Sequence, residues 1–378
     1  MPILEARGRV LSSAQKALVN VPGYDNSAMD GYAINTAELE AGKTEFLVGQ
    51  RIAAGSMGAA LEVGTVARIF TGAAIPPGAD AVVMQENCQV VGDKIQIQKA
   101  VVPAQNIRRA GEDVKLGSEL LARGHRLTAQ DIGLLASIGI AEVEVKNPLK
   151  VALLTTGDEL VRPGHSLQPG QIFNSNFYSL SALLQGLNME VIDLGIIKDD
   201  LDSTGEALAQ AALKADCIIS SGGVSVGDED HVKNAVLNQG TLSLWKLAIK
   251  PGKPFAFGEV CGVPFFGLPG NPVSAFVTFT LLVRPTLLRL LGIADCKAKS
   301  YLVSSGFSVP ETGVRQEYMR VCLEETRAGE QQIVPFASQS SGVLSSLSFA
   351  DGLAVLPPHT AIDKGECLRF IPFSEIVD

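Results

Sequence analysis

The hydrophobic pattern is clearest between residues 150 and 292. Continuous apolar runs at residues 151–154 and 217–219 are typical of strands that are buried on both faces of a sheet. Segments with helical spacing lie between such runs, and the first carries on one face Phe177, Leu180, Leu183, Leu184 and Leu187. This alternation of strand and helix predicts a doubly wound, mostly parallel sheet with helices on both faces.

Several helix starts and one hairpin are marked by specific residues in this region. Ser203 and Glu206 have the spacing of a capping box ahead of an apolar helix. A later helix is expected to begin at Asn271 and Pro272, a favourable N-cap followed by proline, and to kink at Pro285. Short apolar runs on either side of residues 261–262 predict a hairpin appended to the sheet. We assign these elements to an α/β domain at residues 150–296.

The flanking segments have a different pattern. Short β-like runs and a turn at Gly92 and Asp93 predict a small β domain over residues 29–103. Residues 104–149 hold one good helix, with Thr128 and Asp131 at capping-box spacing, and we join this segment with residues 1–28 into a discontinuous α+β domain. Short apolar runs after residue 300 predict a barrel-like β domain at residues 297–378. The fold class is therefore multidomain, α/β plus all-β, with four domains.

Composition narrows the class of protein. The 378 residues are 46% hydrophobic and 19% charged, as in globular chains, and the formal net charge of −9 argues against general nucleic-acid binding. No apolar run is expected to cross a bilayer, and residues 1–7 lack the order of a secretion signal. The six cysteines are scattered, without a metal or disulfide pattern, which favours a reducing cytoplasm. A small anionic ligand stays possible, because local basic clusters can override the net charge.

Three loops follow strands of the α/β domain and precede helices, where open parallel sheets gather ligands. They are residues 155–159, 220–230 and 268–274, and they include Gly222, Gly223 and Gly270. Glycines let backbone N–H groups converge on an anion, and helix N-termini add positive potential. Such turns also occur for geometry alone, but three in one domain favour a phosphate or a similar oxyanion as the ligand.

Charged residues lie close to these loops in the sequence. Lys246, Lys250 and Lys253 occupy one segment, and residues 246 and 250 would share a face if that segment were extended. The alternative is an exposed basic edge. Glu159 and the acidic residues 228–230 have the oxygen ligands that suit Mg²⁺ at a phosphate site, or they cap helices only. Asp30 lies in a tight turn, which by itself indicates a structural role.

Seven segments, taken together and in order, resemble the MoeA family of molybdopterin molybdenumtransferases, relatives of the E domain of gephyrin. They are residues 26–33, 68–73, 110–114, 156–160, 221–227, 250–254 and 268–274. No single segment is specific, but the ordered set covers nearly the whole chain. The resemblance implies a homodimer of four-domain subunits with an elongated α+β domain, and a MogA/MoaB-like α/β domain whose cleft the partner subunit partly closes. Family members usually carry an amphipathic helix before the segment matching residues 4–11, at which this chain begins.

The resemblance also implies the reaction: molybdate is inserted into adenylylated molybdopterin and AMP is released, assisted by Mg²⁺. Implied partners are a molybdopterin adenylyltransferase and other cofactor-synthesis proteins, with no nucleic acid and no membrane. The implied catalytic residues are Asp30, Thr71, Asp113, Glu159, Asp199, Asp230, Lys246 and Lys250, with Glu159 and Asp230 as metal ligands. The implied substrate-binding residues are Gly222, Gly223, Ser225, Lys253, Pro269, Gly270, Asn271, Pro272, Ser274, Arg315 and Ser346. The molybdate site would comprise Ser225, Lys250, Lys253, Ser274, Arg315 and Ser346.

Two other functions stay open from the sequence. A molybdopterin adenylyltransferase resembles the α/β domain, but normally lacks the flanking β domains and the Asp30 segment. A non-enzymatic scaffold of the gephyrin type would share the whole architecture. The carboxylates and lysines at the loops favour an active enzyme over a scaffold.

Overall fold

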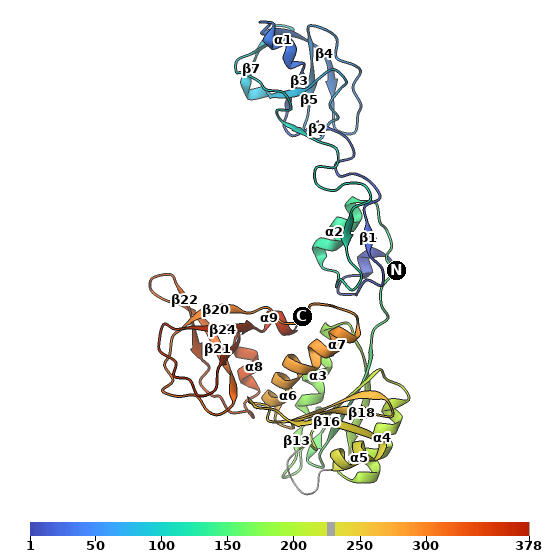
Figure 1. The fold of residues 1–378 in the computed structure, drawn as a ribbon, viewed down its shortest axis with the longest axis vertical. Coiled ribbons are helices and arrows are strands. Elements are labelled where there is room, and N and C mark those ends of the chain that lie inside the picture. The colour runs from blue at the N-terminus through green and yellow to red at the C-terminus, as the bar shows by residue number, and fades with distance from the viewer. Residues whose placement is uncertain (225–230, 378) are drawn as a thin grey trace. The chain divides into compact units, whose positions relative to one another are not determined.

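A computed structural model describes residues 1–224 and 231–377 of the chain (Figure 1). The chain divides into two compact units, Met1–Val145 and Lys146–Asp378. Each unit has sheets and hydrophobic clusters of its own, so each is described by itself.

A six-stranded sheet forms a large part of the first unit. Its strands run in the order β6 (Ala81–Met84), β3 (Gly31–Ile34), β5 (Thr65–Ile69), β4 (Glu45–Ile52), β8 (Lys94–Ile97) and β7 (Cys88–Val91). Neighbouring strands are antiparallel except for β4 and β5. Ile34, Phe46, Val66 and Ile95 form part of its core. The predicted hairpin between β7 and β8 is confirmed, and Gly92 in its turn has a φ of 63°.

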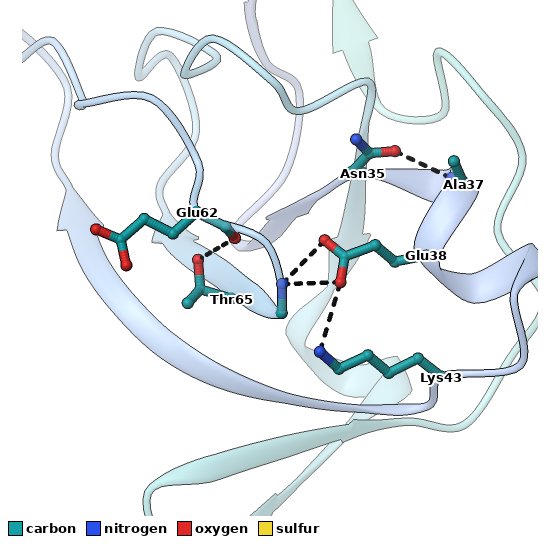
Figure 2. A network of polar contacts seen from close by, with 7 residues as sticks. Asn35, Ala37, Glu38, Lys43, Glu62 and Thr65 are labelled. Carbon is teal, nitrogen blue, oxygen red and sulfur yellow. Dashed lines mark hydrogen bonds and ion pairs between the residues drawn. The ribbon is translucent and has the colours of Figure 1, made fainter.

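Polar contacts fasten the short helix α1 (Thr36–Glu40) to the start of β5, as Figure 2 shows. Asn35 caps the helix, since its side-chain oxygen accepts a backbone N–H of the first turn at 3.0 Å. The Glu38 carboxylate accepts the Gly64 N–H at 2.8 Å and lies 3.5 Å from the Lys43 ammonium. One carboxylate therefore joins the helix to the loop that precedes β5, which indicates a structural role for this network.

The rest of the first unit is built from both ends of its sequence. Two short strand pairs join these ends: β1 (Gln15–Lys16) with β10 (Glu119–Leu121), and β2 (Asn26–Ser27) with β9 (Ile107–Arg108). The turn η1 (Ile3–Glu5) and the helix α2 (Ala129–Ser137) pack around a small core that includes Leu135. The predicted capping box of α2 is confirmed, because the side chains of Thr128 and Asp131 each accept the other residue's backbone N–H.

The second unit contains the predicted α/β sheet. Its strands run in the order β14 (Glu190–Ile197), β11 (Lys150–Thr156), β15 (Cys217–Ser221), β19 (Val263–Leu268), β18 (Pro254–Val260) and β16 (Gly240–Lys246). The first four strands are parallel, and β18 and β16 extend the sheet in the antiparallel sense. The mostly parallel sheet is therefore confirmed, as is the hairpin of β18 and β19 around Cys261 and Gly262.

Helices cover both faces of this sheet (Figure 1). On one face, α4 (Leu201–Ala212) and α5 (His231–Gln239) bury Leu208 and Val236 against the strands. The other face is covered by two more helices, α3 (Ser175–Gly186) and α6 (Pro272–Thr278), which contact each other and the strands β11 and β19. The arrangement is the doubly wound one that the alternating pattern predicts.

The predicted start of α4 is wrong by about one turn. The helix begins at Leu201, because Asp200 is its N-cap: the carboxylate accepts the Ser203 N–H at 2.8 Å and the Ser203 hydroxyl at 2.9 Å. Ser203 and Glu206 have capping-box spacing but lie inside the helix. A charged carboxylate at the N-cap is a strong acceptor and also interacts favourably with the helix dipole, so it outcompetes the later serine.

The helix after β19 continues beyond α6 through a π-helical turn, η3 (Phe279–Val283), into α7 (Arg284–Leu290). The π turn directly precedes the region of Pro285, whose ring and missing N–H disturb regular helical hydrogen bonds. The expectation that no apolar run could span a bilayer is wrong on length and composition, since Pro272–Leu290 has 19 residues and a mean hydropathy of 1.4. However, 67% of the stretch is buried inside the molecule, as expected of a core helix.

The C-terminal strands close into a small barrel. The sheet runs in the order β17 (Ile249–Lys250), β21 (Gln316–Glu325), β22 (Gln331–Pro335), β20 (Tyr301–Ser305), β24 (Cys367–Pro372) and β23 (Gly352–Leu356). Because β21 also pairs with β23, the last five of these strands form a closed ring, and the predicted barrel-like fold is confirmed. The short strand β17 comes from the α/β part and pairs in parallel with β21. Main-chain hydrogen bonds therefore join the two six-stranded sheets of the second unit.

Candidate active site

A cavity of about 730 Å³ lies at the carboxyl ends of the parallel strands. Its walls come from the loops that follow β11, β14, β15 and β19, from the start of α3, and from a loop of the barrel. The three loops that the sequence marks as ligand-gathering therefore converge on one cavity, at the edge where open parallel sheets bind ligands.

The loop after β11 carries Glu159 to the cavity. Gly157 has a φ of 144°, and a Cβ at this position would lie 2.6 Å from the Glu159 carboxylate. Side chains with a Cβ rarely adopt this φ, so the turn favours glycine, and the Glu159 carboxylate lies against it. Asp199, from the loop after β14, lines the same cavity. Two of the predicted carboxylates thus come together from different strands.

Gly222 and Gly223, after β15, line the cavity with their backbone. Both have positive φ, 95° and 65°. A Cβ on Gly222 would lie 2.5 Å from the Thr156 carbonyl oxygen, and one on Gly223 would lie 2.4 Å from Val232. Only glycines let this loop lie so close to the end of β11, as expected of a loop whose backbone approaches a ligand.

The loop after β19 supplies the residues Pro269, Gly270, Asn271, Pro272 and Ser274 to the cavity. Asn271 takes the predicted N-cap position of α6 with Pro272 in the first turn, although its side chain makes no capping hydrogen bond within the described residues. Ser274 is buried and lines the cavity. All five predicted residues of this loop therefore reach the cavity wall.

A loop of the barrel completes the wall with Gly342 and Leu344. The buried Arg320 guanidinium holds this loop, donating to the carbonyl oxygens of Ser338 at 3.2 Å and Ser340 at 2.9 Å. Burial lowers the pKa of Arg320. Arg320 is not predicted from the sequence, because nothing in an alternating strand marks one inward-facing arginine as the residue that holds a distant loop.

Ser346 lies next to this loop but is not among the described residues that line the cavity. It is fully buried, and its hydroxyl accepts a hydrogen bond from Arg320 Nε at 3.1 Å and donates to the Val343 carbonyl at 2.6 Å. Its hydroxyl is therefore already engaged in holding the barrel loop.

The three predicted lysines do not form one extended strand. Lys246 ends β16, whereas Lys250 belongs to β17 in the other sheet, and Leu247 between them bonds to the Lys253 carbonyl. All three lysines are exposed, and none is among the described residues of the cavity wall. The chain passes from one sheet to the other here. Residues 246–250 are therefore not one extended strand, and Lys246 and Lys250 do not share a strand face.

Lys250 and Arg315 meet where β17 joins β21. The Lys250 ammonium lies 3.1 Å from both carboxylate oxygens of Glu317. Arg315 donates to the Ile249 carbonyl at 3.0 Å. The structure thus brings together two residues of the predicted molybdate site that are far apart in sequence.

Asp30 and Thr71 form a pair in the first unit. The Asp30 carboxylate accepts the backbone N–H and the hydroxyl of Thr71, both at 2.8 Å. These two hydrogen bonds, with the Arg68 charge, hold the pKa of Asp30 below its ordinary value. Asp113 is exposed, and the described hydrogen bonds and ion pairs do not link its side chain to this pair. Two further predicted residues, Ser225 and Asp230, lie outside the described residues.

Sequence reasoning missed a group of buried polar residues behind the cavity. Asn174 caps α3, accepting the Phe177 N–H at 3.3 Å, and donates to the Thr155 hydroxyl at 2.8 Å. Asn176 and Thr156 also line the cavity. The two asparagines flank Ser175 just ahead of an apolar helix, a signal that could have identified the cap. Nothing local reveals that Asn176 reaches Ser221 in β15 and Gly270 in the loop after β19.

No group of three or more His, Cys, Asp or Glu residues capable of holding a metal occurs within residues 1–224 and 231–377. Glu159 and Asp199 are the predicted carboxylates on the cavity. Mg²⁺ at phosphate sites typically uses one or two carboxylates together with substrate oxygens, so this pair fits such an ion.

Known protein families match the chain in three consecutive stretches. The family described as "MoeA N-terminal region (domain I and II)" matches residues 1–139, and the one described as "Probable molybdopterin binding domain" matches residues 152–289. The family described as "MoeA C-terminal region (domain IV)" matches residues 303–373. Together these stretches contain both the Asp30 pair and the cavity.

Full-length relatives agree with these matches. The molybdopterin molybdenumtransferase of Haemophilus influenzae is 39% identical, over 99% of this chain and 93% of its own. Molybdopterin molybdenumtransferase 2 of Mycobacterium tuberculosis is 36% identical, over 94% and 90%. A crystal structure of the molybdopterin biosynthesis MoeA protein from Pyrococcus horikoshii matches with a TM-score of 0.83 and 30% identity, over 98% of this chain and 93% of that chain.

The fold and the site define a class of multidomain proteins in which an open α/β sheet, with a glycine-rimmed cavity, is joined to a small β barrel. The chain belongs to the MoeA family of molybdopterin molybdenumtransferases, a family of molybdenum cofactor biosynthesis.

Proposed function

We propose that this chain is a transferase that inserts molybdate into adenylylated molybdopterin and releases AMP. The observation that carries the proposal is the cavity of about 730 Å³, where the glycine loops expose backbone and Glu159 and Asp199 line the wall. The relatives are named molybdopterin molybdenumtransferases, which supports molybdopterin as the substrate and molybdenum as the metal that is inserted. The adenylyl group, the Mg²⁺ and the residue roles are part of this proposal.

Positioning and charge stabilisation suffice for the phosphate chemistry. Water is added across the pyrophosphate bond, so that one phosphate leaves as AMP and the other stays on the pterin. The backbone N–H groups of the loops at Gly223 and Gly270 hold the phosphates, and Lys246 adds positive charge. Such prearranged donors stabilise the charge that develops as the bond breaks.

Glu159 and Asp199 are proposed to hold Mg²⁺, with Asp230 as a further ligand. Bound Mg²⁺ would neutralise phosphate charge in the transition state. Glu159 and Asp199 also orient the attacking water, because a carboxylate oxygen accepts its proton or its hydrogen bond. Support comes from their shared position on the cavity wall.

Molybdate is proposed to lie beside the β17–β21 junction. This tetrahedral dianion needs converging donors, which Lys, Arg and Ser side chains supply. The position of Ser274 on the cavity wall and the meeting of Lys250 with Arg315 support this placement. The proposed ligands are Ser225, Lys250, Lys253, Ser274, Arg315 and Ser346. For Ser346, the hydrogen bond with Arg320 would first have to open.

We also propose a cytoplasmic homodimer of four-domain subunits, in which the partner subunit partly closes the active cleft. The domains are residues 1–28 with 104–149, 29–103, 150–296 and 297–378. The substrate would come from a molybdopterin adenylyltransferase. The assembly is checked directly by sedimentation of the full chain, where a monomer at all concentrations would contradict it.

The activity test uses the full chain with adenylylated molybdopterin, Mg²⁺ and molybdate. AMP and molybdenum–molybdopterin should form, and Glu159→Gln or Lys246→Ala should slow AMP release by about tenfold or more without lowering the melting temperature. Formation of adenylylated pterin from molybdopterin and ATP without molybdate would instead indicate an adenylyltransferase. Binding without AMP release would indicate a scaffold.

A further inference from the structure

Asn176 on the cavity wall has a side-chain oxygen without a hydrogen-bond partner among the described residues. Asn176, in the first turn of α3, is only 8% exposed and lines the cavity. Its Nδ2 donates to the Gly270 carbonyl at 2.8 Å and to the Ser221 hydroxyl at 2.9 Å. A carbonyl oxygen cannot donate, so the Gly270 contact fixes which end of the amide is Nδ2. The remaining atom, Oδ1, is buried and has no hydrogen-bond partner among the described residues.

Thr156, at the end of β11, is in the same situation. It is 5% exposed, lines the cavity, and its Oγ1 is buried without a hydrogen-bond partner in the described part of the chain. A Cβ on Gly223 would lie 2.7 Å from this Oγ1, so the hydroxyl lies against the glycine loop. We call Asn176 Oδ1 and Thr156 Oγ1 the floor pair.

The neighbours of the floor pair hold it in place. The Ser221 hydroxyl, which accepts from Asn176, donates to the Pro269 carbonyl at 3.3 Å. The Gly222 N–H donates to the Leu268 carbonyl at 3.1 Å. The side chain of Asn176 is therefore fixed by Ser221 at the end of β15 and by Gly270 in the loop after β19. Because unpaired buried polar atoms destabilise a fold, two of them on one cavity point to a ligand as the missing partner.

The hydrogen-bonding capacity of the floor pair determines which ligand groups can bind to it. An amide oxygen only accepts hydrogen bonds, whereas a hydroxyl either donates or accepts. Phosphate and molybdate oxygens are acceptors at neutral pH, so Asn176 Oδ1 would repel them. An N–H group on a planar heterocycle is the complementary partner, since it donates to Oδ1 while a neighbouring ring atom meets the Thr156 hydroxyl.

We propose that Asn176 and Thr156 are specificity residues that recognise the N–H edge of the substrate's heterocycle. The ring then lies where the floor pair meets the glycine loops. This inference rests on the proposed function and extends it, because it names the part of the substrate that Asn176 and Thr156 contact. The pterin ring and the adenine ring both carry N–H groups, so either is a candidate occupant.

The test compares two isosteric substitutions in the full chain. Thr156→Val removes the hydroxyl of the floor pair, and Thr204→Val removes a buried hydroxyl in α4 that likewise has no partner among the described residues. Thr204 is not among the described residues of the cavity wall. Neither variant breaks a described hydrogen bond, so both should melt at or above the wild-type temperature. A clear fall in melting temperature for Thr156→Val would mean that its hydroxyl serves the fold, and would overturn the inference.

Affinities for molybdopterin and for AMP are then measured separately. Thr156→Val should weaken one of them by about five- to tenfold, and Thr204→Val should weaken neither. Asn176→Ala should weaken the same ligand as Thr156→Val. If only the affinity for molybdopterin falls, the pterin ring binds at the floor pair. If only the affinity for AMP falls, the adenine ring binds there.

Two outcomes separate this inference from the proposed function. If the wild type binds molybdopterin and Thr156→Val binds both ligands as tightly as the wild type does, the floor pair does not recognise the ring and the inference is overturned. If the wild type binds neither molybdopterin nor AMP, the proposed function itself fails.

Discussion

Lys250 already has an anionic partner before any oxyanion binds. Its side chain is 53% exposed, and it pairs with the less exposed Glu317 carboxylate at 3.1 Å. Exposed ion pairs contribute only about 0–1 kcal/mol, since water and salt screen them. A dianion that reaches Lys250 can therefore compete with Glu317 for the ammonium.

Glu317→Gln should raise the affinity of the full chain for molybdate by about two- to fivefold, because the competing negative charge is lost. Lys250→Ala should lower this affinity by about tenfold or more. Isothermal calorimetry measures both, with the exposed Lys214→Ala as the control. Weaker binding by Glu317→Gln would mean that Glu317 supports Lys250 instead of competing with the ligand.

The Asp30–Thr71 pair makes a prediction about pH. The pKa of Asp30 is lowered mainly by the Thr71 backbone N–H and then by its hydroxyl. Its stabilising contribution is therefore present above the unfolded value of about 3.9 and is lost as the pH falls through the lower folded value. Thr71→Val should move the Asp30 pKa part of the way back up. Carboxyl NMR titration checks this, and an unchanged pKa would mean that the hydroxyl bond contributes nothing.

At the scale of elements, the loops at the cavity depend on glycine geometry. Gly222 combines a φ of 95° with a Cβ position only 2.5 Å from a backbone oxygen. The loop therefore cannot keep its course with any other residue. The helices behave differently, because the Cβ position of an exposed glycine such as Gly133 in α2 has no described atom within 4 Å apart from its chain neighbours and the backbone of its own helix.

Gly222→Ala should abolish AMP release and destabilise the fold by roughly 1–3 kcal/mol, since strained backbone must move. Gly133→Ala should keep the activity and stabilise the fold by up to about 1 kcal/mol, because alanine favours helix. Thermal melts and AMP assays measure both effects. If the two alanine variants behaved alike, the close packing at Gly222 would not govern the loop.

Element-level prediction succeeded where the signal is local. The β7–β8 hairpin, the capping box of Thr128 and Asp131 and the Asn271–Pro272 helix start were all visible in short stretches. The α4 start failed, because two capping residues compete and the sequence does not rank Asp200 above Ser203. Strand β17 was missed as a separate element, because a two-residue strand is defined only by its partner in the barrel.

At the scale of the whole molecule, the predicted residues are distributed over two compact units. Asp30, Thr71 and Asp113 belong to Met1–Val145, and the cavity belongs to Lys146–Asp378. Each unit has its own sheets and core, so each contains the contacts that a separate domain needs.

Fragments 1–145 and 146–378 should therefore fold when made separately, and each should unfold in its own cooperative transition by circular dichroism. Fragment 146–378 should bind molybdopterin, because it contains the whole described cavity, but it should not release AMP without Asp30 and Thr71. Rapid AMP release by fragment 146–378 alone would remove those two residues from the catalytic set. The full chain under the same conditions is the control.

The sequence by itself determined the classes of element and the family. Continuous apolar runs mark strands that are buried on both faces, and helical spacing follows from the direction of successive side chains. The buried strands, the helices and the parallel sheet could therefore be predicted directly. Glycine loops after strands were equally visible, because backbone that approaches a ligand or another strand excludes a Cβ. Only the tertiary structure decided which of these loops share a cavity. It placed Asn176 against Ser221 and Gly270, paired Lys250 with Glu317, and engaged Ser346 with Arg320. Those contacts join residues far apart along the chain, and no local pattern encodes a distance that the packing of the whole sheet and barrel sets.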